Sequence, residues 1–180
     1  APCCTADEVN EAIAAAKAAY PGWSSTPAIK RSQILFKVRE LIMEHMEELT
    51  RLVAEENGKV WAEAEGDVLK AKEGTELATQ VPSLMMGESL MDASTGYDTV
   101  KYREPLGVFA GIVPVNFPAM IPFGWMAPTC IATGNTMVLK AASLTPKTAM
   151  KFAAIYKEAG VPDGVINVIT CSRNEVNTIL

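Results

Sequence analysis

The sequence predicts an α/β protein in which N-terminal helices and an antiparallel hairpin precede the first strands of a parallel sheet. Three observations support this prediction: apolar residues at helical spacing up to about residue 82, turn-forming residues over 83–104, and alternating strand and helix patterns over 105–180. We therefore divide the chain into an N-terminal helical part (1–82), a protruding arm (83–104) and the first βα units of a sheet domain (105–180).

Composition narrows the class of protein before any motif is considered. The 180 residues are 49% hydrophobic and 21% charged, which excludes a disordered chain and a disulfide-rich scaffold. The net charge of −5 provides no strong positive field for nucleic acid, and no run of about 18 apolar residues is present to span a membrane. We expect a cytoplasmic protein without nucleic-acid or membrane partners.

The four cysteines are Cys3, Cys4, Cys130 and Cys171. They lack the Cys-x-x-Cys or Cys/His spacing of a zinc ligand set, so we expect no metal site and free thiols in a reducing compartment. Cys130 lies in an apolar helical pattern and Cys171 follows the last predicted strand, and neither has a His nearby in sequence. We expect neither to be a catalytic nucleophile.

The first helix begins at a capping box formed by Thr5 and Glu8, in which each residue satisfies a free backbone N–H of the other. We expect this helix to run to about Tyr20 and to end at Pro21.

A second helix is expected to begin with Pro27 at its first position, and its apolar pattern continues to a C-terminal cap at Gly58. A third helical stretch follows over 59–78. It contains Gly66 and Gly74, each of which costs roughly 1 kcal/mol relative to Ala in a helix interior.

The arm is rich in turn formers such as Gly87 and Gly96, and residues 99–103 alternate apolar and polar side chains. This pattern predicts an antiparallel hairpin. A hairpin that extends beyond a compact core often contacts another copy of the chain, so we expect the arm to be an oligomer contact.

Apolar runs at 107–113, 136–139 and 165–169 predict three strands, helical patterns occupy 117–133 and 146–158, and Asn174 is expected to cap a further helix. This order implies right-handed crossovers and a parallel sheet. Because prolines bound its apolar run on both sides, we expect the first strand to be buried on both faces.

Parallel sheets bind ligands at the carboxyl ends of their strands, which makes Asn116 and Lys140 candidate site residues. The amide of Asn116 can donate to a developing oxyanion, or it can simply cap the helix expected to start at Phe117. Lys140 can bond a ribose hydroxyl or a phosphate, or it can be a surface lysine at a strand end. The chain has no glycine-rich phosphate loop, so a dinucleotide site would be incomplete or built differently.

Four motifs resemble those of the aldehyde dehydrogenase superfamily in sequence and in order. They are Tyr-Arg-Glu-Pro-Leu-Gly-Val at 102–108, Pro-Val-Asn-Phe-Pro at 114–118, Gly-Asn-Thr-Met-Val-Leu-Lys at 134–140 and Gly-Val-Pro-Asp-Gly-Val-Ile-Asn at 160–167. The N-terminal helices extend the resemblance over essentially the whole chain. Segments 82–90 and 116–122 are most similar to the methylmalonate-semialdehyde dehydrogenase branch, which is CoA-acylating.

The resemblance implies a Rossmann-like sheet and the oxidation of an aldehyde. In that reaction a cysteine nucleophile forms a thiohemiacetal and then a thioester. NAD or NADP accepts the hydride, and water or CoA accepts the acyl group. It identifies Asn116 as the oxyanion-hole amide and Lys140 as the lysine that holds the adenosine ribose. The strand end that runs alongside the cofactor comprises Ile112, Val113, Pro114 and Val115. The arm matches the family's oligomerisation hairpin, so a homodimer or homotetramer is expected.

Two positions depart from the family pattern. Ser143 stands where a Glu often clasps both ribose hydroxyls, and without that carboxylate NADP is as acceptable as NAD. Lys70 stands near the position of an arginine that reads a substrate carboxylate in the methylmalonate-semialdehyde branch, and a lysine keeps the charge without the bidentate geometry. The family's catalytic cysteine, general-base glutamate and glycine turn all lie beyond Leu180.

We therefore expect the front part of a longer NAD(P)-dependent aldehyde dehydrogenase that is inactive by itself, an expectation strengthened by the missing initiator Met. Two other interpretations stay open: a non-catalytic cofactor-binding or assembly module, and an unrelated three-layer domain whose ligand is not a nucleotide.

Overall fold

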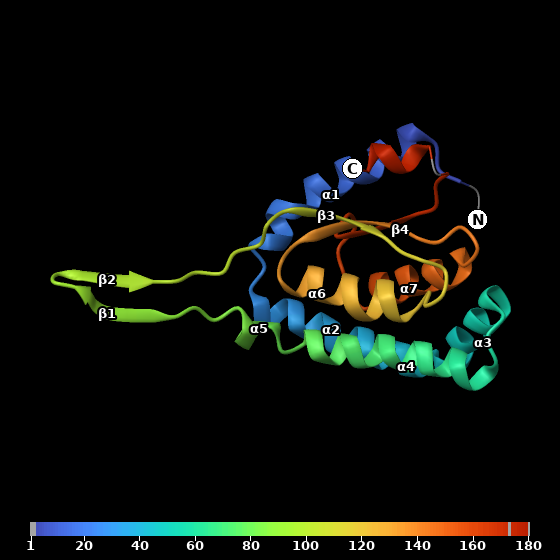
Figure 1. Ribbon diagram of the computed structural model, residues 1–180, viewed down its shortest axis with the longest axis horizontal. Helices are drawn as coiled ribbons and strands as arrows, with labels where there is room; N and C mark the ends of the chain where they lie inside the picture. Colours follow the sequence, from blue (N-terminus) through green and yellow to red (C-terminus); the bar gives the residue numbers. More distant parts are fainter. Residues whose placement is uncertain (1–2, 173, 180) are drawn as a thin grey trace.

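The computed structural model describes residues 3–172 and 174–179, which form helical layers on both faces of a small parallel sheet, with one arm projecting from the body (Figure 1). The sheet consists of β3 (Val108–Ile112), β4 (Thr136–Lys140) and β5 (Ile166–Ile169). Helix α1 (Ala6–Ser24) covers one face, and α6 (Ala127–Ala132) and α7 (Pro146–Glu158) cover the other. A further layer packs against α6 and α7 and contains α2 (Ala28–Glu44), α3 (Met46–Asn57) and α4 (Trp61–Ala78). The predicted α/β class is confirmed.

Helix α1 begins at the predicted capping box but ends later than predicted. The N–H of Glu8 donates to Thr5 Oγ1 at 3.3 Å, and the N–H of Thr5 donates to the Glu8 carboxylate at 2.7 Å. The helix continues through Pro21 for a further turn, so the prediction that it ends there is wrong. Tertiary packing is the reason, because Trp23 in this last turn is buried and its Nε1–H donates to the Ile131 carbonyl at 2.9 Å.

The second predicted helix is divided in two, so the prediction of one continuous helix is wrong. His45, with φ −98° and ψ 15°, separates α2 from α3. This change of direction allows Leu41 of α2 and Val53 of α3 to enter the same apolar core. Gly58 caps α3 at φ 78°, as predicted, whereas Pro27 occupies the N-cap of α2 rather than its first position.

Helix α4 passes very close to the π-helix η1 (Ile121–Met126), and this approach explains Gly74. A Cβ atom on Gly74 would lie 2.8 Å from the Cα of Gly124, and a Cβ atom on Gly124 would lie 2.9 Å from the Cα of Ala71. Gly66 of the same helix has no atom within 4 Å of the position that a Cβ would occupy. Packing therefore requires glycine at position 74 but not at position 66.

The helical segment between β3 and β4 starts as η1 and becomes α6, so the single predicted helix is interrupted. The N–H of Ala127 donates to the carbonyl five residues earlier, which leaves the Phe123 carbonyl without its α-helical donor. The Tyr156 hydroxyl donates to that carbonyl at 3.4 Å, and the Thr75 hydroxyl lies at the same distance from it while it also donates to the Ala71 carbonyl at 2.9 Å. The wide turn also suits Pro128, which has no N–H and whose ring would press on the preceding turn of an α-helix.

The arm consists of two antiparallel strands, β1 (Ser89–Ser94) and β2 (Tyr97–Val100), which follow the short helix α5 (Val81–Leu84). Gly96 provides the positive φ of 78° in the connecting turn. Every residue of both strands is exposed, and Figure 1 shows the arm extending away from the body. The predicted hairpin is confirmed, and its contact with another copy stays a prediction.

Strand β4 lies between β3 and β5 and is parallel to both. Its first four residues are buried, whereas Val108, Phe109 and Ile112 of β3 are 37%, 38% and 45% exposed. The prediction that the first strand is buried on both faces is therefore wrong. In the part of the chain that the structure describes, β3 is an edge strand and nothing pairs with its outer side.

Two apolar clusters form the core. The larger one includes Trp23 and Val165 and joins the N-terminal helices to the sheet. The smaller one lies between α1 and the sheet and includes Val138 and Cys171. The last helical element among the described residues is η2 (Glu175–Thr178), a single 3-10 turn. Asn174 is its N-cap residue but makes no side-chain cap, so the prediction that Asn174 caps this segment is wrong.

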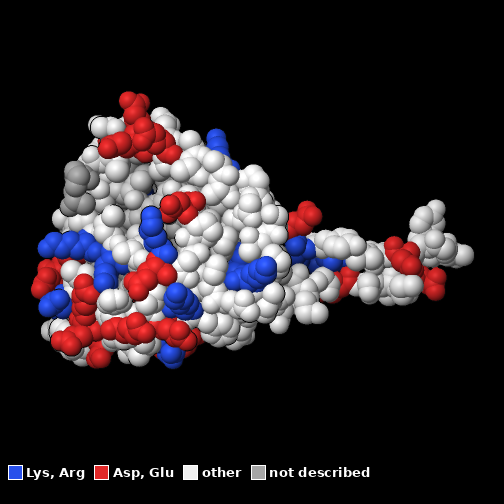
Figure 2. All heavy atoms as spheres, turned by 180° about the vertical axis from the view of Figure 1, so that it is seen from behind, with Lys and Arg blue, Asp and Glu red and all other residues white. Residues whose placement is uncertain are grey.

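The outer surface carries charges of both signs. On the face drawn in Figure 2, Lys and Arg side chains are interspersed with Asp and Glu over the body of the molecule. Within residues 3–172 and 174–179, no helix combines the length and the apolar character needed to cross a membrane.

Candidate functional site

The carboxyl ends of β3 and β4 meet at one edge of the sheet, from which the chain continues to Asn116 and to Ser143. Ile112 pairs with Lys140, and the N–H of Val113 donates to the Lys140 carbonyl at 3.3 Å just beyond the last strand pair. The loops that carry Asn116 and Ser143 therefore leave the sheet side by side, as expected for neighbouring parallel strands.

Asn116 lies on an exposed loop after β3, and its side chain bonds no other residue that the structure describes. The following helical segment has Met120 at its N-cap, and the N–H of Met120 donates to Oδ1 of Asp67 at 2.7 Å. The interpretation of Asn116 as the helix cap is therefore wrong, because a carboxylate from α4 caps this helix. The Asn116 amide is left available to a ligand.

Three residues hold the segment that follows β3, and we call Asn57, Lys59 and Asp67 the loop anchor. The Nδ2–H of Asn57 donates to the Val115 carbonyl at 2.7 Å. The Lys59 ammonium lies 3.0 Å from Oδ2 of Asp67 and 4.1 Å from the centroid of the Phe117 ring. Together these contacts fix the loop from both sides of Asn116. Sequence reasoning missed the loop anchor, since nothing local in the sequence pairs these residues with the loop.

A cavity of about 490 Å³ opens beside the loop anchor. The residues that line it are Lys59, Glu63, Gly66, Asp67, Lys70, Phe117 and Met120. The Lys70 ammonium lies 2.6 Å from the Glu73 carboxylate, but both side chains are more than half exposed. Such an exposed ion pair is weak, so Lys70 can exchange Glu73 for a competing anion.

The loop that leads from Lys140 to α7 is held by Glu56 of α3. Its carboxylate accepts the N–H of Lys147 at 2.7 Å, the N–H of Thr148 at 2.8 Å and the Thr148 hydroxyl at 2.8 Å. Glu56 thus satisfies the free N–H groups at the start of α7, where a negative charge is favoured. Sequence reasoning also missed this contact.

The edge formed by these loops leaves several polar and apolar groups open to a ligand. Lys140 is half-buried, and among the described residues it faces no carboxylate at ion-pair distance, so its N–H donors are open to a ligand. Ile112, Pro114 and Val115 are exposed and accessible to a ligand, whereas the predicted site residue Val113 is buried in the larger apolar cluster. Ser143 is exposed as well and adds no negative charge.

The cysteines do not supply a nucleophile at this edge. Burial raises the pKa of the Cys130 thiol to about 12, so this residue is protonated at neutral pH. Burial also raises the pKa of Cys171, an effect that the positive charge of Lys140 partly counteracts. In the described part of the chain, no group of three or more His, Cys, Asp or Glu residues is arranged to hold a metal ion.

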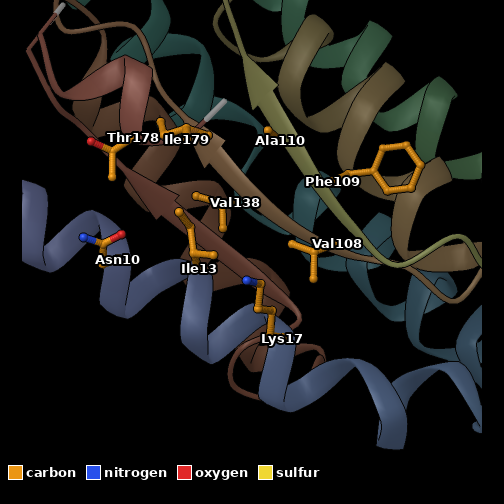
Figure 3. A pocket seen from close by; sticks show the side chains of 9 residues that line it. All are labelled: Asn10, Ile13, Lys17, Val108, Phe109, Ala110, Val138, Thr178 and Ile179. Atoms are coloured by element: carbon orange, nitrogen blue, oxygen red, sulfur yellow. The ribbon is translucent and has the colours of Figure 1, made fainter.

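A second cavity, of about 390 Å³, lies on the α1 face of the sheet, next to the outer side of β3 (Figure 3). Figure 3 shows Ile13 and Lys17 of α1 opposite Val108 of β3 and Val138 of β4. Among the described residues that line the cavity, Lys17 is the one that carries a charge, and no predicted site residue is among them. This cavity therefore lacks the convergent polar groups of a catalytic site.

Comparison with known proteins identifies the family of the chain. A sequence model of the aldehyde dehydrogenase family matches residues 1–180. A malonate-semialdehyde dehydrogenase from Geobacillus kaustophilus is 48% identical over 179 residues, which are 99% of this chain and 37% of the relative. Another from Lacticaseibacillus casei is 45% identical over 99% of this chain and 36% of its own length.

Solved structures give the same result. A methylmalonate-semialdehyde dehydrogenase from Oceanimonas doudoroffii has a TM-score of 0.95 at 38% identity and covers 98% of this chain and 36% of its own. A Sinorhizobium meliloti protein described as a methylmalonate-semialdehyde dehydrogenase in complex with NAD has a TM-score of 0.95 at 34% identity, over 99% of this chain and 36% of its own. The chain spans just over a third of the length of these relatives. Sequence and fold agree over its whole length, and the chain belongs to the aldehyde dehydrogenase family.

Proposed function

We propose that this chain forms the front part of an NAD- or NADP-dependent aldehyde dehydrogenase and supplies the cofactor ribose contact and part of the oxyanion hole. The observation that carries the proposal is the pairing of Ile112 with Lys140, which brings Lys140 and the loop to Asn116 to one edge of the sheet. Family membership supports aldehyde oxidation as the reaction class. The cysteine nucleophile belongs to a further part of the parent protein.

The cofactor contacts in this proposal come from two loops. Lys140 donates to the hydroxyls of the adenosine ribose, and the chain from Ile112 to Val115 runs alongside the dinucleotide. Ser143 offers a hydroxyl where a carboxylate would repel a 2′-phosphate, so both NAD and NADP are acceptable. When bound, the nicotinamide ring supplies the hydride acceptor for the oxidation.

Asn116 acts on the oxygen of the aldehyde. When a thiolate adds to the carbonyl carbon, that oxygen gains negative charge, and the Asn116 amide donates a hydrogen bond to it. A single donor of this kind typically contributes about 10²–10³-fold to the rate. The contact from Asn57 to the Val115 carbonyl supports this role, because it holds the residue next to Asn116 in place.

The substrate class that fits is a short aldehyde that also carries a carboxylate, such as malonate or methylmalonate semialdehyde. The names of the relatives support this class. So does Lys70 in the cavity beside the Asn116 loop, because its exposed ion pair with Glu73 can be exchanged for a substrate carboxylate, whereas Lys59 is already paired with Asp67. We further propose CoA as the acyl acceptor, a homo-oligomer formed through the β1–β2 arm, and a cytoplasmic location.

Cofactor binding by the 180-residue chain tests this proposal. Calorimetric titration with NAD⁺ and with NADP⁺ is expected to show binding that Lys140→Ala weakens about tenfold or more, as expected for the loss of a hydrogen bond from a charged group. The control is Lys37→Ala, which removes an exposed lysine of α2 and should leave the affinity unchanged. Equal affinities for the Lys140→Ala variant and the unaltered chain would contradict the assignment.

Activity distinguishes the catalytic proposal from a purely structural role. With malonate semialdehyde, NAD⁺ and CoA, the 180-residue chain should produce no steady NADH, whereas the longer parent protein should turn over. Steady turnover by the 180-residue chain would show that the nucleophile lies within it. A parent protein that binds NAD⁺ but never oxidises the aldehyde would instead indicate a non-catalytic binding or assembly module.

A further inference from the structure

Two cysteines that are distant in sequence are paired through their backbones. Cys4 forms a parallel β-bridge with Cys171, and the N–H of Cys4 donates to the carbonyl of Thr170 at 2.5 Å. This bridge attaches the N-terminal segment to the chain just beyond β5. Figure 1 shows η2 lying beside α1 near this place.

The bridge places the two thiols within reach of each other. Neighbouring strands lie about 4.8 Å apart, and disulfides span Cα separations of about 4.4–6.8 Å. Directly opposed residues of a parallel pair project to the same face, whereas the adjacent Cys3 projects to the opposite face. Cys4 also packs against the small apolar cluster that contains Cys171.

The surroundings of the pair differ from those of the other cysteines. Cys171 is 1% exposed, Cys4 is half-buried and Cys3 is exposed, so a reagent from solvent meets Cys4 before it meets Cys171. Cys130 belongs to the larger apolar cluster on the other side of the sheet and has no comparable partner.

We propose that Cys4 and Cys171 are a redox-active pair that reacts with a low-molecular-weight disulfide such as oxidised glutathione and closes to an intramolecular disulfide. Disulfides in reducing compartments are characteristically transient and redox-sensing, so the bond is reversible. Its formation locks the N-terminal segment onto the end of β5, next to the edge that carries Lys140.

The reaction proceeds in two exchange steps. The Cys4 thiolate attacks one sulfur of oxidised glutathione, the S–S bond of glutathione breaks, and one glutathione thiolate leaves. The Cys171 thiolate then attacks the Cys4 sulfur, the mixed disulfide breaks, and the second glutathione leaves. The two cysteines lose two electrons and two protons, and one glutathione disulfide becomes two glutathione thiols. Burial raises the pKa of the Cys171 thiol and slows the second step, and the positive charge of Lys140 offsets this effect only in part.

The test is a mass measurement on the 180-residue chain. The chain is equilibrated in reduced and oxidised glutathione, quenched with acid, denatured and treated with N-ethylmaleimide. In the oxidising buffer we expect two alkylated cysteines, Cys3 and Cys130, and one peptide pair that joins Cys4 to Cys171. The Cys3→Ser control should form the same bond, and Cys4→Ser should form none.

Thermal unfolding provides a second, independent measurement. A bond between residues near the two ends of the chain constrains almost the whole unfolded chain, so oxidation should raise the Tm by about 5–10 °C. Cys4→Ser should show no such rise. Three outcomes would each overturn the proposal. They are four alkylated cysteines in every buffer, a disulfide bond from Cys3 to Cys171, and a glutathione adduct on Cys4 that does not go on to form a disulfide with Cys171.

Discussion

Breaking the buried ion pair between Lys59 and Asp67 tests whether the loop anchor holds the segment that carries Asn116. The Asp67 side chain has no exposed surface, that of Lys59 is 12% exposed, and their charged atoms lie 3.0 Å apart. Asp67 also accepts the N–H of Met120 at 2.7 Å. The variant Asp67→Asn keeps an acceptor for this N–H but removes the charge that faces Lys59, whereas Asp67→Ala removes both.

The expected costs follow from these contacts. Loss of one partner of a buried pair leaves the other charge uncompensated and costs about 3–5 kcal/mol of unfolding free energy. We place Asp67→Asn and Lys59→Met near the lower end of this range. Asp67→Ala belongs at its upper end, because an unsatisfied backbone N–H adds about 1–3 kcal/mol. The double variant Lys59→Met/Asp67→Asn contains no unpaired charge and should cost about 1–3 kcal/mol less than the sum of its single changes.

Urea unfolding followed by tryptophan fluorescence measures these free energies. The exposed pair Lys70 and Glu73 on the same helix is the matched control, and its double-variant cycle should yield a coupling of at most about 0.5 kcal/mol. If the changes at Lys59 and Asp67 were additive within about 0.5 kcal/mol, the two side chains would not act as a pair, and the reasoning would be refuted.

Two further predictions concern packing and are measured by urea unfolding. Gly66→Ala should stabilise the chain by about 0.5–1 kcal/mol, because the added methyl group meets no atom within 4 Å. Gly74→Ala in the same helix should destabilise it by about 1–3 kcal/mol, because the methyl group meets the backbone of η1. Equal effects of the two substitutions on the unfolding free energy would contradict the close approach of α4 and η1. Arg31 is buried, and its guanidinium donates to the carbonyl of Ala132 at 2.9 Å and to the carbonyl of Thr26. Arg31→Leu should therefore lower the free energy of unfolding by about 2–4 kcal/mol. A decrease below about 1 kcal/mol would show that these hydrogen bonds are dispensable.

Elements with a strong local signal could be predicted from the sequence. The capping box at Thr5, the αL cap at Gly58 and the proline at the start of α7 each act within one turn of the chain, so the residues that form the signal are also neighbours in the fold. The strands could be predicted for a related reason, because short apolar runs bounded by proline or glycine have few other stable arrangements. These elements depend little on distant contacts.

Where a distant contact decides the local conformation, the sequence rules failed. Proline at position 21 normally ends a helix, but burial of Trp23 in the next turn outweighs the lost hydrogen bond. The π-helix η1 is stable because hydroxyls from α4 and α7 contact the carbonyl that it frees. Neither partner is visible within a window of local sequence.

The same distinction applies to the candidate site. Topology alone predicts that Lys140 and the loop leading to Asn116 start from the same edge of the sheet, since parallel neighbouring strands end at the same edge. The residues that hold their loops could not be found in this way, because Asn57 is 58 residues from Val115 in the chain and Asp67 is 53 residues from Met120.

The contacts that hold the site loops give the N-terminal helices a role beyond covering the sheet. Glu56 caps the helix that follows Lys140, and Asp67 caps the helix that follows Asn116. Both strand-end loops are therefore held by carboxylates from the outer helical layer, and a carboxylate is the group that a helix N-terminus favours. Because each loop is held from outside the sheet, we expect a change in α3 or α4 to alter the proposed cofactor contact or the proposed oxyanion contact without touching either Lys140 or Asn116.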